Sequence, residues 1–269
     1  MKRLILFIFS ISFLFNLSSE NSKFYYNKAL EKINLNDNIG ANSYLNTAIL
    51  MNPDYAEAYC LRAAIKELRG DFEEAIVDLN VAIKINPLYQ EAISLRGNVW
   101  YDQKKYKLAI IDFTKTLEIN PNDIQSYILR GQAKYHMQNF LNAVIDFTKA
   151  IEINPNEIQG YIYRGLAKYE LHDFNSAIAD YNKSIEINPN NAFSYISRGL
   201  AKYGLHDFKS AIDDYNKAIE IDPKNPLSYK HRGLLKIKLG NKYAGCIDLK
   251  KAVKLGDSEA SELIKSNCQ

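Results

Sequence analysis

Apolar and small residues recur three or four positions apart over most of this chain, in pairs of segments separated by short polar stretches. Residues 192–225 carry two such series: Tyr195, Gly199 and Tyr203, and then Ala211, Tyr215 and Ala218. Side chains at this spacing share one face of an α-helix, whereas a half-buried strand needs strict alternation. Each pair of segments therefore predicts a hairpin of two amphipathic helices.

The second helix of each predicted hairpin has a start signal and a stop signal. Asp or Asn residues suited to an N-cap precede it at five places: Asp71, Asn139, Asp173, Asp207 and Asn241. Six prolines, each preceded by Asn or Asp, follow it: Pro53, Pro87, Pro121, Pro155, Pro189 and Pro223. Because the residue before a proline disfavours the α conformation, the second helix is predicted to end there.

The six prolines stand 34 residues apart, and this period divides most of the chain into equal units. Seven units follow one another without insertion: 22–55, 56–89, 90–123, 124–157, 158–191, 192–225 and 226–259. A fixed period of this size is typical of a stacked array in which one unit cannot bury its own apolar face. A single inserted residue would rotate later helices by about 100°, so the unbroken register predicts continuous packing.

The order of side chains within a unit resembles the tetratricopeptide repeat. That family carries an aromatic residue, Gly and a second aromatic residue on the first helix, then Ala, an aromatic residue, Ala and Pro on the second. The fourth unit matches this order with Tyr127, Gly131, Tyr135, Ala143, Phe147, Ala150 and Pro155. The resemblance implies an all-α fold, a right-handed superhelical solenoid of seven helical hairpins whose first helices line the inner wall.

Arginine and aspartate follow the same period. The arginines are Arg62, Arg96, Arg130, Arg164, Arg198 and Arg232, and each is followed 16 residues later by an aspartate: Asp78, Asp112, Asp146, Asp180, Asp214 and Asp248. The first unit has Lys28 and Tyr44 at these places, so it lacks both partners. We interpret the pairs as structural ties between the two helices of a hairpin, because identical pairs spread along an array do not converge on one substrate.

The resemblance also implies a binding groove along the first helices. Its candidate residues are Tyr101, Ile128, Tyr135, Ile162, Leu166, Tyr169, Ile196, Leu200 and Tyr203. On the same side of units two and three stand Glu57, Glu67, Glu91 and Asp102, which predicts an acidic start to the groove. Aromatic rings with a polar tip suit peptide recognition, although the same tyrosines can instead pack against neighbouring units.

The N-terminus has the pattern of a secretory signal peptide. Lys2 and Arg3 precede an apolar run over residues 4–15, and small residues suited to processing follow up to Ser19. We predict that residues 1–19 are removed and that the chain is exported to a periplasmic, envelope-associated or secreted location. The run is shorter than the about 20 residues of a membrane-spanning helix, so no integral membrane span is expected in the mature chain. The alternative is an uncleaved apolar segment that tethers the chain.

A short helix over residues 258–269 is predicted to cap the last hairpin. Cys246 replaces the Ile or Val of units two to six, on the face expected to touch this helix. In an exported chain, a disulfide between Cys246 and Cys268 would hold the cap in place. Two buried free thiols are the alternative.

Charge and composition narrow the possible functions. Removal of Lys2 and Arg3 from the 34 basic residues leaves 32 against 31 acidic residues, with no dense basic run, which argues against a nucleic-acid partner. The four histidines fall in different units, and there is no glycine-rich phosphate loop. We therefore expect no catalytic residue, no metal and no cofactor.

Two functions fit these observations. The first is a non-catalytic protein-protein interaction scaffold that binds a peptide or helix of a partner protein in the concave groove. The second is a structural spacer or assembly subunit that joins partners through its ends or its convex face. Substitution of the groove tyrosines distinguishes them, because it abolishes partner capture only in the first case.

Overall fold

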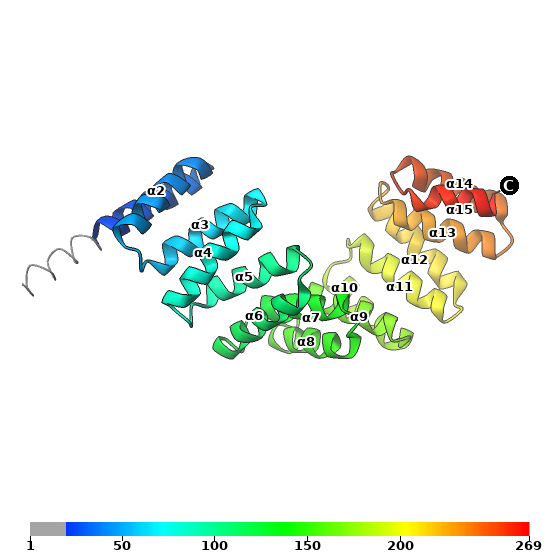
Figure 1. Ribbon diagram of the computed structural model, residues 1–269. Coiled ribbons are helices and arrows are strands. Elements are labelled where there is room, and N and C mark those ends of the chain that lie inside the picture. Colours follow the sequence, from blue (N-terminus) through cyan, green and yellow to red (C-terminus); the bar gives the residue numbers. More distant parts are fainter. Residues whose placement is uncertain (1–19, 269) are drawn as a thin grey trace, which may run out of the picture. The chain divides into compact units, whose positions relative to one another are not determined.

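The computed structural model describes residues 20–268, and this part of the chain consists of helices joined by short turns (Figure 1). The segment on which the signal-peptide prediction rests lies outside the described residues. Within them, no helix combines the length and the apolar character needed to cross a membrane. The chain divides into two compact units, Met1–Leu129 and Arg130–Gln269. The predicted all-α class is confirmed.

The first unit contains three complete hairpins. The first pairs a helix over residues 20–34 with α2; the elements that follow are α2 (Asn38–Met51), α3 (Ala56–Arg69), α4 (Phe72–Ile85), α5 (Gln90–Asp102) and α6 (Tyr106–Ile119). The core lies between the two helices of each hairpin and between successive hairpins, where alanines such as Ala63 and Ala75 are completely buried beside Leu79 and Val99.

The second unit continues the same arrangement and ends with an additional helix. Its elements are most of α7 (Ile124–His136), followed by α8 (Phe140–Ile153), α9 (Ile158–Glu170), α10 (Phe174–Ile187), α11 (Ala192–Gly204), α12 (Phe208–Ile221), α13 (Pro226–Lys238), α14 (Lys242–Lys254) and α15 (Glu259–Asn267). The helix α15 packs on α14, as expected of a cap on the last hairpin.

Glycine allows the two helices of a hairpin to approach closely. A Cβ atom added to Gly199 of α11 would lie 2.6 Å from Cε1 of Tyr215 on α12, and a Cβ atom added to Gly165 would lie the same distance from Cε1 of Tyr181. Real Cβ atoms do not approach other heavy atoms this closely, so a side chain would force the helices apart. The periodic glycines therefore provide space for the buried ring of the opposite helix.

The predicted stop signals of the second helices are confirmed, and the start signals are confirmed in part. The helices α4, α6, α8 and α10 all end immediately before the Asn that precedes the proline. The side chains of Asp173, Asp207 and Asn241 accept hydrogen bonds from the backbone N–H three residues later. Asp71 and Asn139 also stand at the predicted N-cap position, but their side chains accept no hydrogen bond from the helix backbone.

All six predicted pairs of arginine and aspartate are present. In each pair, Nε and Nη2 of the arginine donate to the two carboxylate oxygens at 2.6–3.0 Å, a bidentate geometry. The aspartate side chains are only 1–6% exposed. We call this series the charge ladder.

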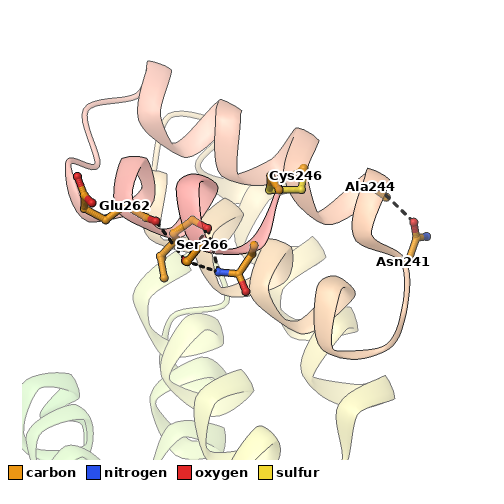
Figure 2. The surroundings of a disulfide bond; sticks show 8 residues. Asn241, Ala244, Cys246, Glu262 and Ser266 are labelled. Atoms are coloured by element: carbon orange, nitrogen blue, oxygen red, sulfur yellow. Dashed lines mark hydrogen bonds between the residues drawn. A yellow bond between two sulfur atoms is a disulfide. The ribbon is translucent and has the colours of Figure 1, made fainter.

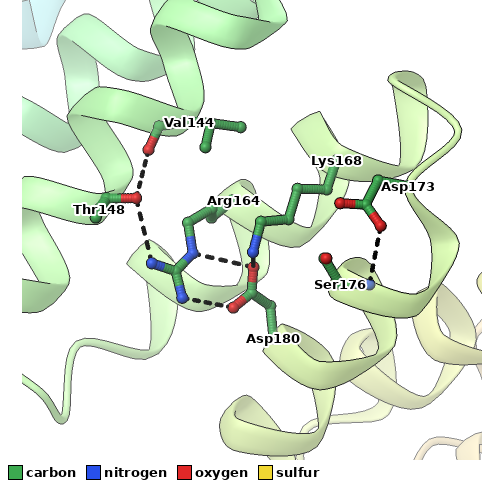
Figure 3. Close-up of polar contacts among 7 residues, drawn as sticks. All are labelled: Val144, Thr148, Arg164, Lys168, Asp173, Ser176 and Asp180. Carbon is green, nitrogen blue, oxygen red and sulfur yellow. Dashed lines mark hydrogen bonds and ion pairs between the residues drawn. The ribbon is translucent and has the colours of Figure 1, made fainter.

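The charge ladder contains more contacts than the sequence pattern predicted (Figure 3). Lys168 donates a third charged hydrogen bond to Asp180 at 2.8 Å, beside the two from Arg164. The remaining Nη1 atom of Arg164 donates to Oγ1 of Thr148, which lies on α8 in the preceding repeat and donates in turn to the carbonyl of Val144. One guanidinium thus joins both helices of its own hairpin and the second helix of the hairpin before it.

The C-terminal helix is attached to the last hairpin by charge and by a disulfide, which Figure 2 shows. The sulfur atoms of Cys246 on α14 and Cys268 after α15 are 2.04 Å apart. On α13, the ammonium of Lys230 is almost completely buried and contacts Glu259 at 2.7 Å and Asp257 at 3.2 Å. These contacts hold α15 where the first helix of a further repeat would stand.

Candidate functional site

The four predicted groove tyrosines pack against their own hairpins and keep part of each ring exposed. Each lies 5.3–5.5 Å, between ring centroids, from an aromatic residue at the start of the second helix: Tyr101 on Tyr106, Tyr135 on Phe140, Tyr169 on Phe174 and Tyr203 on Phe208. All four are partly buried. The packing role and an exposed contact surface therefore coexist in the same side chains.

In the second unit, three of these phenols form a row on successive first helices. Burial raises the pKa of Tyr135 to about 12, and the neighbouring Glu170 and Tyr169 add to the effect. The pKa of Tyr169 is raised by burial, by Glu170 and by Tyr203. Leu166 and Leu200 lie on the same helices and are half-buried. We call Tyr135, Leu166, Tyr169, Leu200 and Tyr203 the tyrosine-leucine face.

The structure corrects the assignment of the three predicted groove isoleucines. Ile128, Ile162 and Ile196 are 1%, 9% and 2% exposed. Ile196 belongs to the apolar core that also contains Tyr215 and Leu235. These side chains are buried in the core and offer almost no surface to a partner.

A cavity opens beside the end of the tyrosine-leucine face. Its volume is about 150 Å³, and the residues around it come from α11, α12 and α13: Leu200, Tyr203, Tyr215, His231, Leu234 and Leu235. The imidazole of His231 stacks on Tyr215, with the ring centroids 5.9 Å apart. Burial, aided by the charge of Lys230, lowers the pKa of His231 to about 4, so this imidazole is neutral at pH 7.

A lysine stands next to this cavity. Nζ of Lys238 donates to the hydroxyl oxygen of Tyr203 at 2.8 Å. It also lies 4.5 Å from the centroid of the Tyr203 ring and 5.1 Å from that of Phe208. Within residues 20–268, no carboxylate pairs with this ammonium. The cation is held on two aromatic rings and remains available for an anionic group.

The sequence analysis did not single out His231, Tyr215 or Lys238 as part of this site. A signal was present, because the tyrosine series that runs from Tyr101 to Tyr203 stops one period later at Ile237. The next residue, Lys238, then supplies a charged contact to the last tyrosine. A break in a period of side chains therefore marks the position of this cavity.

The first unit has a different surface on its first helices. Burial raises the pKa of Glu67, and the charge of Asp102 adds to it, so these two of the four predicted acidic residues lie near one another. Tyr26 and Tyr55 lie 5.1 Å apart, between ring centroids. The thiol of Cys60 is buried nearby, and burial raises its pKa to about 11, which makes it a weak nucleophile at neutral pH.

The candidate metal ligands within residues 20–268 do not cluster. No group of three or more His, Cys, Asp or Glu side chains is arranged to hold a metal ion in this part of the chain. His172 and His206 occupy hairpin turns with backbone φ angles of 60° and 63°, so their periodic positions serve left-handed turns.

The fold and the site define a helical repeat protein with a partly exposed aromatic face. Sequence models described as tetratricopeptide repeat match residues 26–89, 124–157, 158–191 and 192–225, more than half of the chain. The chain belongs to the tetratricopeptide repeat family. Proteins of this family are generally non-catalytic scaffolds for protein interactions. The comparison with curated protein sequences found no match.

Solved structures agree on the fold. A tetratricopeptide repeat protein from Parabacteroides merdae ATCC 43184 is 19% identical, with a TM-score of 0.73 over 93% of this chain and 100% of that chain. The C-terminal part of a repeat protein from Cytophaga hutchinsonii is 18% identical, with a TM-score of 0.71 over 88% and 98%. YrrB, described as a repeat protein with an unusual peptide-binding site, is 21% identical, with a TM-score of 0.60 over 68% and 95%.

Proposed function

We propose that this protein is a non-catalytic scaffold that binds a peptide or helix of a partner protein along the tyrosine-leucine face. The observation that carries the proposal is the row of phenols and leucines on successive first helices, each held in place by its own hairpin and each partly exposed. Rigid side chains lose little conformational entropy on binding, so a preformed aromatic row suits the capture of an extended segment. The peptide-binding site of YrrB is a precedent on the same fold.

A selection from a library of phage-displayed random peptides on the purified protein tests this proposal. We expect enriched peptides that lose binding when Leu166→Asp and Leu200→Asp are combined, because both changes place a charge on the face. Tyrosine substitutions are less suitable, since these rings also stabilise their hairpins. The matched control is Ile145→Asp on the second helix α8, where the side chain is 57% exposed. Absence of any enriched peptide would contradict the proposal.

The spacer function remains the second candidate, and one observation favours it. Apolar side chains that follow the 34-residue period are exposed on second helices: Val77, Ile111, Ile145 and Ile247. Exposed apolar patches often mark protein contacts. If peptide or partner binding is lost with Ile145→Asp and kept with the double leucine variant, the outer face is the binding surface and the groove proposal is wrong.

We further propose that the chain is exported and acts in an oxidising compartment. The N-terminal pattern and the bond between Cys246 and Cys268 support this, because disulfides persist outside the reducing cytosol. Fractionation of cells should find the protein outside the cytoplasm, with a new N-terminus near residue 20. If the protein is found in the cytoplasm with Met1 as its N-terminus, the export proposal is wrong and the binding proposal is unaffected.

A further inference from the structure

The cavity beside Tyr203 is the most specific feature of the second unit. Most of the residues around it are apolar, and they come from three helices of two successive repeats, so packing of the hairpins fixes its shape. A dry cavity of about 150 Å³ is large enough for a benzene ring. The cavity is therefore suited to one Phe or Leu side chain.

The polar groups around the cavity favour a neutral occupant. His231 is uncharged at neutral pH, and its ring lies flat against that of Tyr215. The Tyr203 hydroxyl already accepts from Lys238. A charged group placed in this cavity would lose its hydration with no opposite charge among the residues that surround it.

The rim of the cavity, in contrast, favours a negatively charged group. Lys238 is exposed and held against Tyr203 and Phe208, and no carboxylate in the described part of the chain pairs with it. Its equivalent two repeats earlier is Glu170, which accepts a hydrogen bond from Tyr135 at 3.3 Å. The same position of the repeat thus carries an acidic residue, Glu170, in residues 158–191 and a basic residue, Lys238, in residues 226–259. Of the two, only Lys238 stands beside the cavity.

We propose that this cavity is the anchor subsite of the protein, and that it takes a Phe or Leu side chain of a partner segment with an acidic side chain nearby that pairs with Lys238. The proposal rests on the proposed binding function and names the chemistry of the segment. The anchor provides most of the affinity because it is removed from water, and the acidic residue fixes the position and direction of the segment.

Toluene, the side-chain analogue of phenylalanine, tests the cavity directly. In a protein with labelled leucine methyl groups, we expect toluene to shift the NMR signals of Leu200, Leu234 and Leu235. Leu249 of α14 is buried and is not among the residues around the cavity, so it serves as the internal control. Leu234→Phe fills the cavity and should abolish the shifts. Shifts that are absent, or equally large at Leu249, overturn the proposal.

Selected peptides then test the segment. Enriched peptides should share Phe or Leu within a few positions of Asp or Glu. Leu234→Phe should weaken their binding about 10- to 100-fold, the value of burying one such side chain, whereas Leu239→Phe adds the same atoms at an exposed place on the same chain segment and should have little effect. Circular dichroism verifies that both variants fold.

A charge exchange locates the acidic residue. Lys238→Glu should weaken binding about fivefold, and a peptide whose acidic residue is replaced by Lys should restore it; Lys224→Glu, at another exposed lysine, is the control. If peptides bind the tyrosine-leucine face but ignore Leu234→Phe and Lys238→Glu, the anchor proposal is wrong and the binding function stands. If no peptide is enriched, both are wrong.

Discussion

The first and last hairpins join their two helices by different means. In the first, Tyr44 stands where other repeats have aspartate, and it stacks on Tyr25 with the ring centroids 6.2 Å apart. In the last, Arg232 donates two hydrogen bonds to Asp248, and Lys236 donates a third at 2.8 Å. The same fold is thus closed by an aromatic contact at one end and by buried charges at the other.

This difference shows what the charge ladder contributes. Stacked rings tolerate small displacements, whereas a bidentate pair fixes both distance and direction. Arg232 also donates to Asn216 on the preceding hairpin at 2.7 Å and lies over the Tyr229 ring. A buried ion pair adds little net stability over apolar packing, but it penalises every arrangement that leaves one charge alone. We infer that the ladder defines the register between hairpins.

Removal of one ladder charge is expected to have the largest effect. Asp248→Asn leaves Arg232 and Lys236 without a carboxylate in a mostly buried place, and loss of one partner of a buried pair costs about 3 to 5 kcal/mol. Hydrogen exchange of the α13 and α14 amides should report a loss of this size. Tyr44→Phe keeps the stacked ring of the first hairpin and should change the exchange of α2 very little. Equal effects of the two variants would contradict the comparison.

Acid should act on the ladder in the same direction. Burial alone would raise the pKa of Asp248, but hydrogen bonds from Arg232 and Lys236 outweigh it and hold the pKa below the usual range. A lowered folded-state pKa means that the stabilisation is present above the unfolded-state value and is lost as the pH falls through the folded-state value. The first hairpin has Tyr44 in place of this aspartate, so acid should loosen the last hairpin first.

Reduction of the disulfide is expected to have the next largest effect. The bond closes a loop between residues that are 22 positions apart, for which the chain-entropy model gives about 3 kcal/mol. The combined variant Cys246→Ser and Cys268→Ser should therefore increase amide exchange in α15 and in the end of α14. The helices of the first hairpin should be unaffected, because they contain no cysteine. Unchanged exchange in α15 would show that Lys230 and its two acidic partners hold the cap alone.

The sequence was sufficient for the features that repeat. The 34-residue period predicted the hairpins and the ends of the second helices. The ion pairs were predicted because Arg and Asp occur together in six units and are both missing from the first, where Lys28 and Tyr44 stand. Features that depend on the packing of one repeat against the next were not visible. Arg232 bonding to Asn216 is one, and the burial of Ile196 is another, because a helical period gives the face of a residue but not what covers it.

Protonation of His231 should also distinguish the last hairpin from the first, since the first 135 residues contain no histidine. Its pKa of about 4 lies below the ordinary value of 6.5, mainly through burial, with the charge of Lys230 aiding and those of Asp257 and Glu259 opposing. The unfolded chain therefore takes up a proton first, and stability should fall as the pH drops from 6.5 towards 4. We expect a loss of about 2 kcal/mol in the wild type, and His231→Gln should remove this part of the pH dependence. A variant with the same thermal melts as the wild type at pH 4.5 and pH 7 would show that the imidazole is solvated.

The smallest expected effect concerns how the second helices begin. Asn241 caps α14 in the last hairpin by accepting from the N–H of Ala244 at 3.2 Å, whereas Asn139 stands at the same place before α8 without a bond to the helix backbone. Asn241→Ala should therefore cost about 1 kcal/mol, the usual value of a lost N-cap, and Asn139→Ala clearly less. Because the two changes remove identical atoms from equivalent sites, their difference in chemical denaturation isolates the cap bond from helix propensity. If both variants lose the same free energy of unfolding, the effect of Asn arises in the unfolded chain. The cap bond would then add nothing to the stability of the last hairpin.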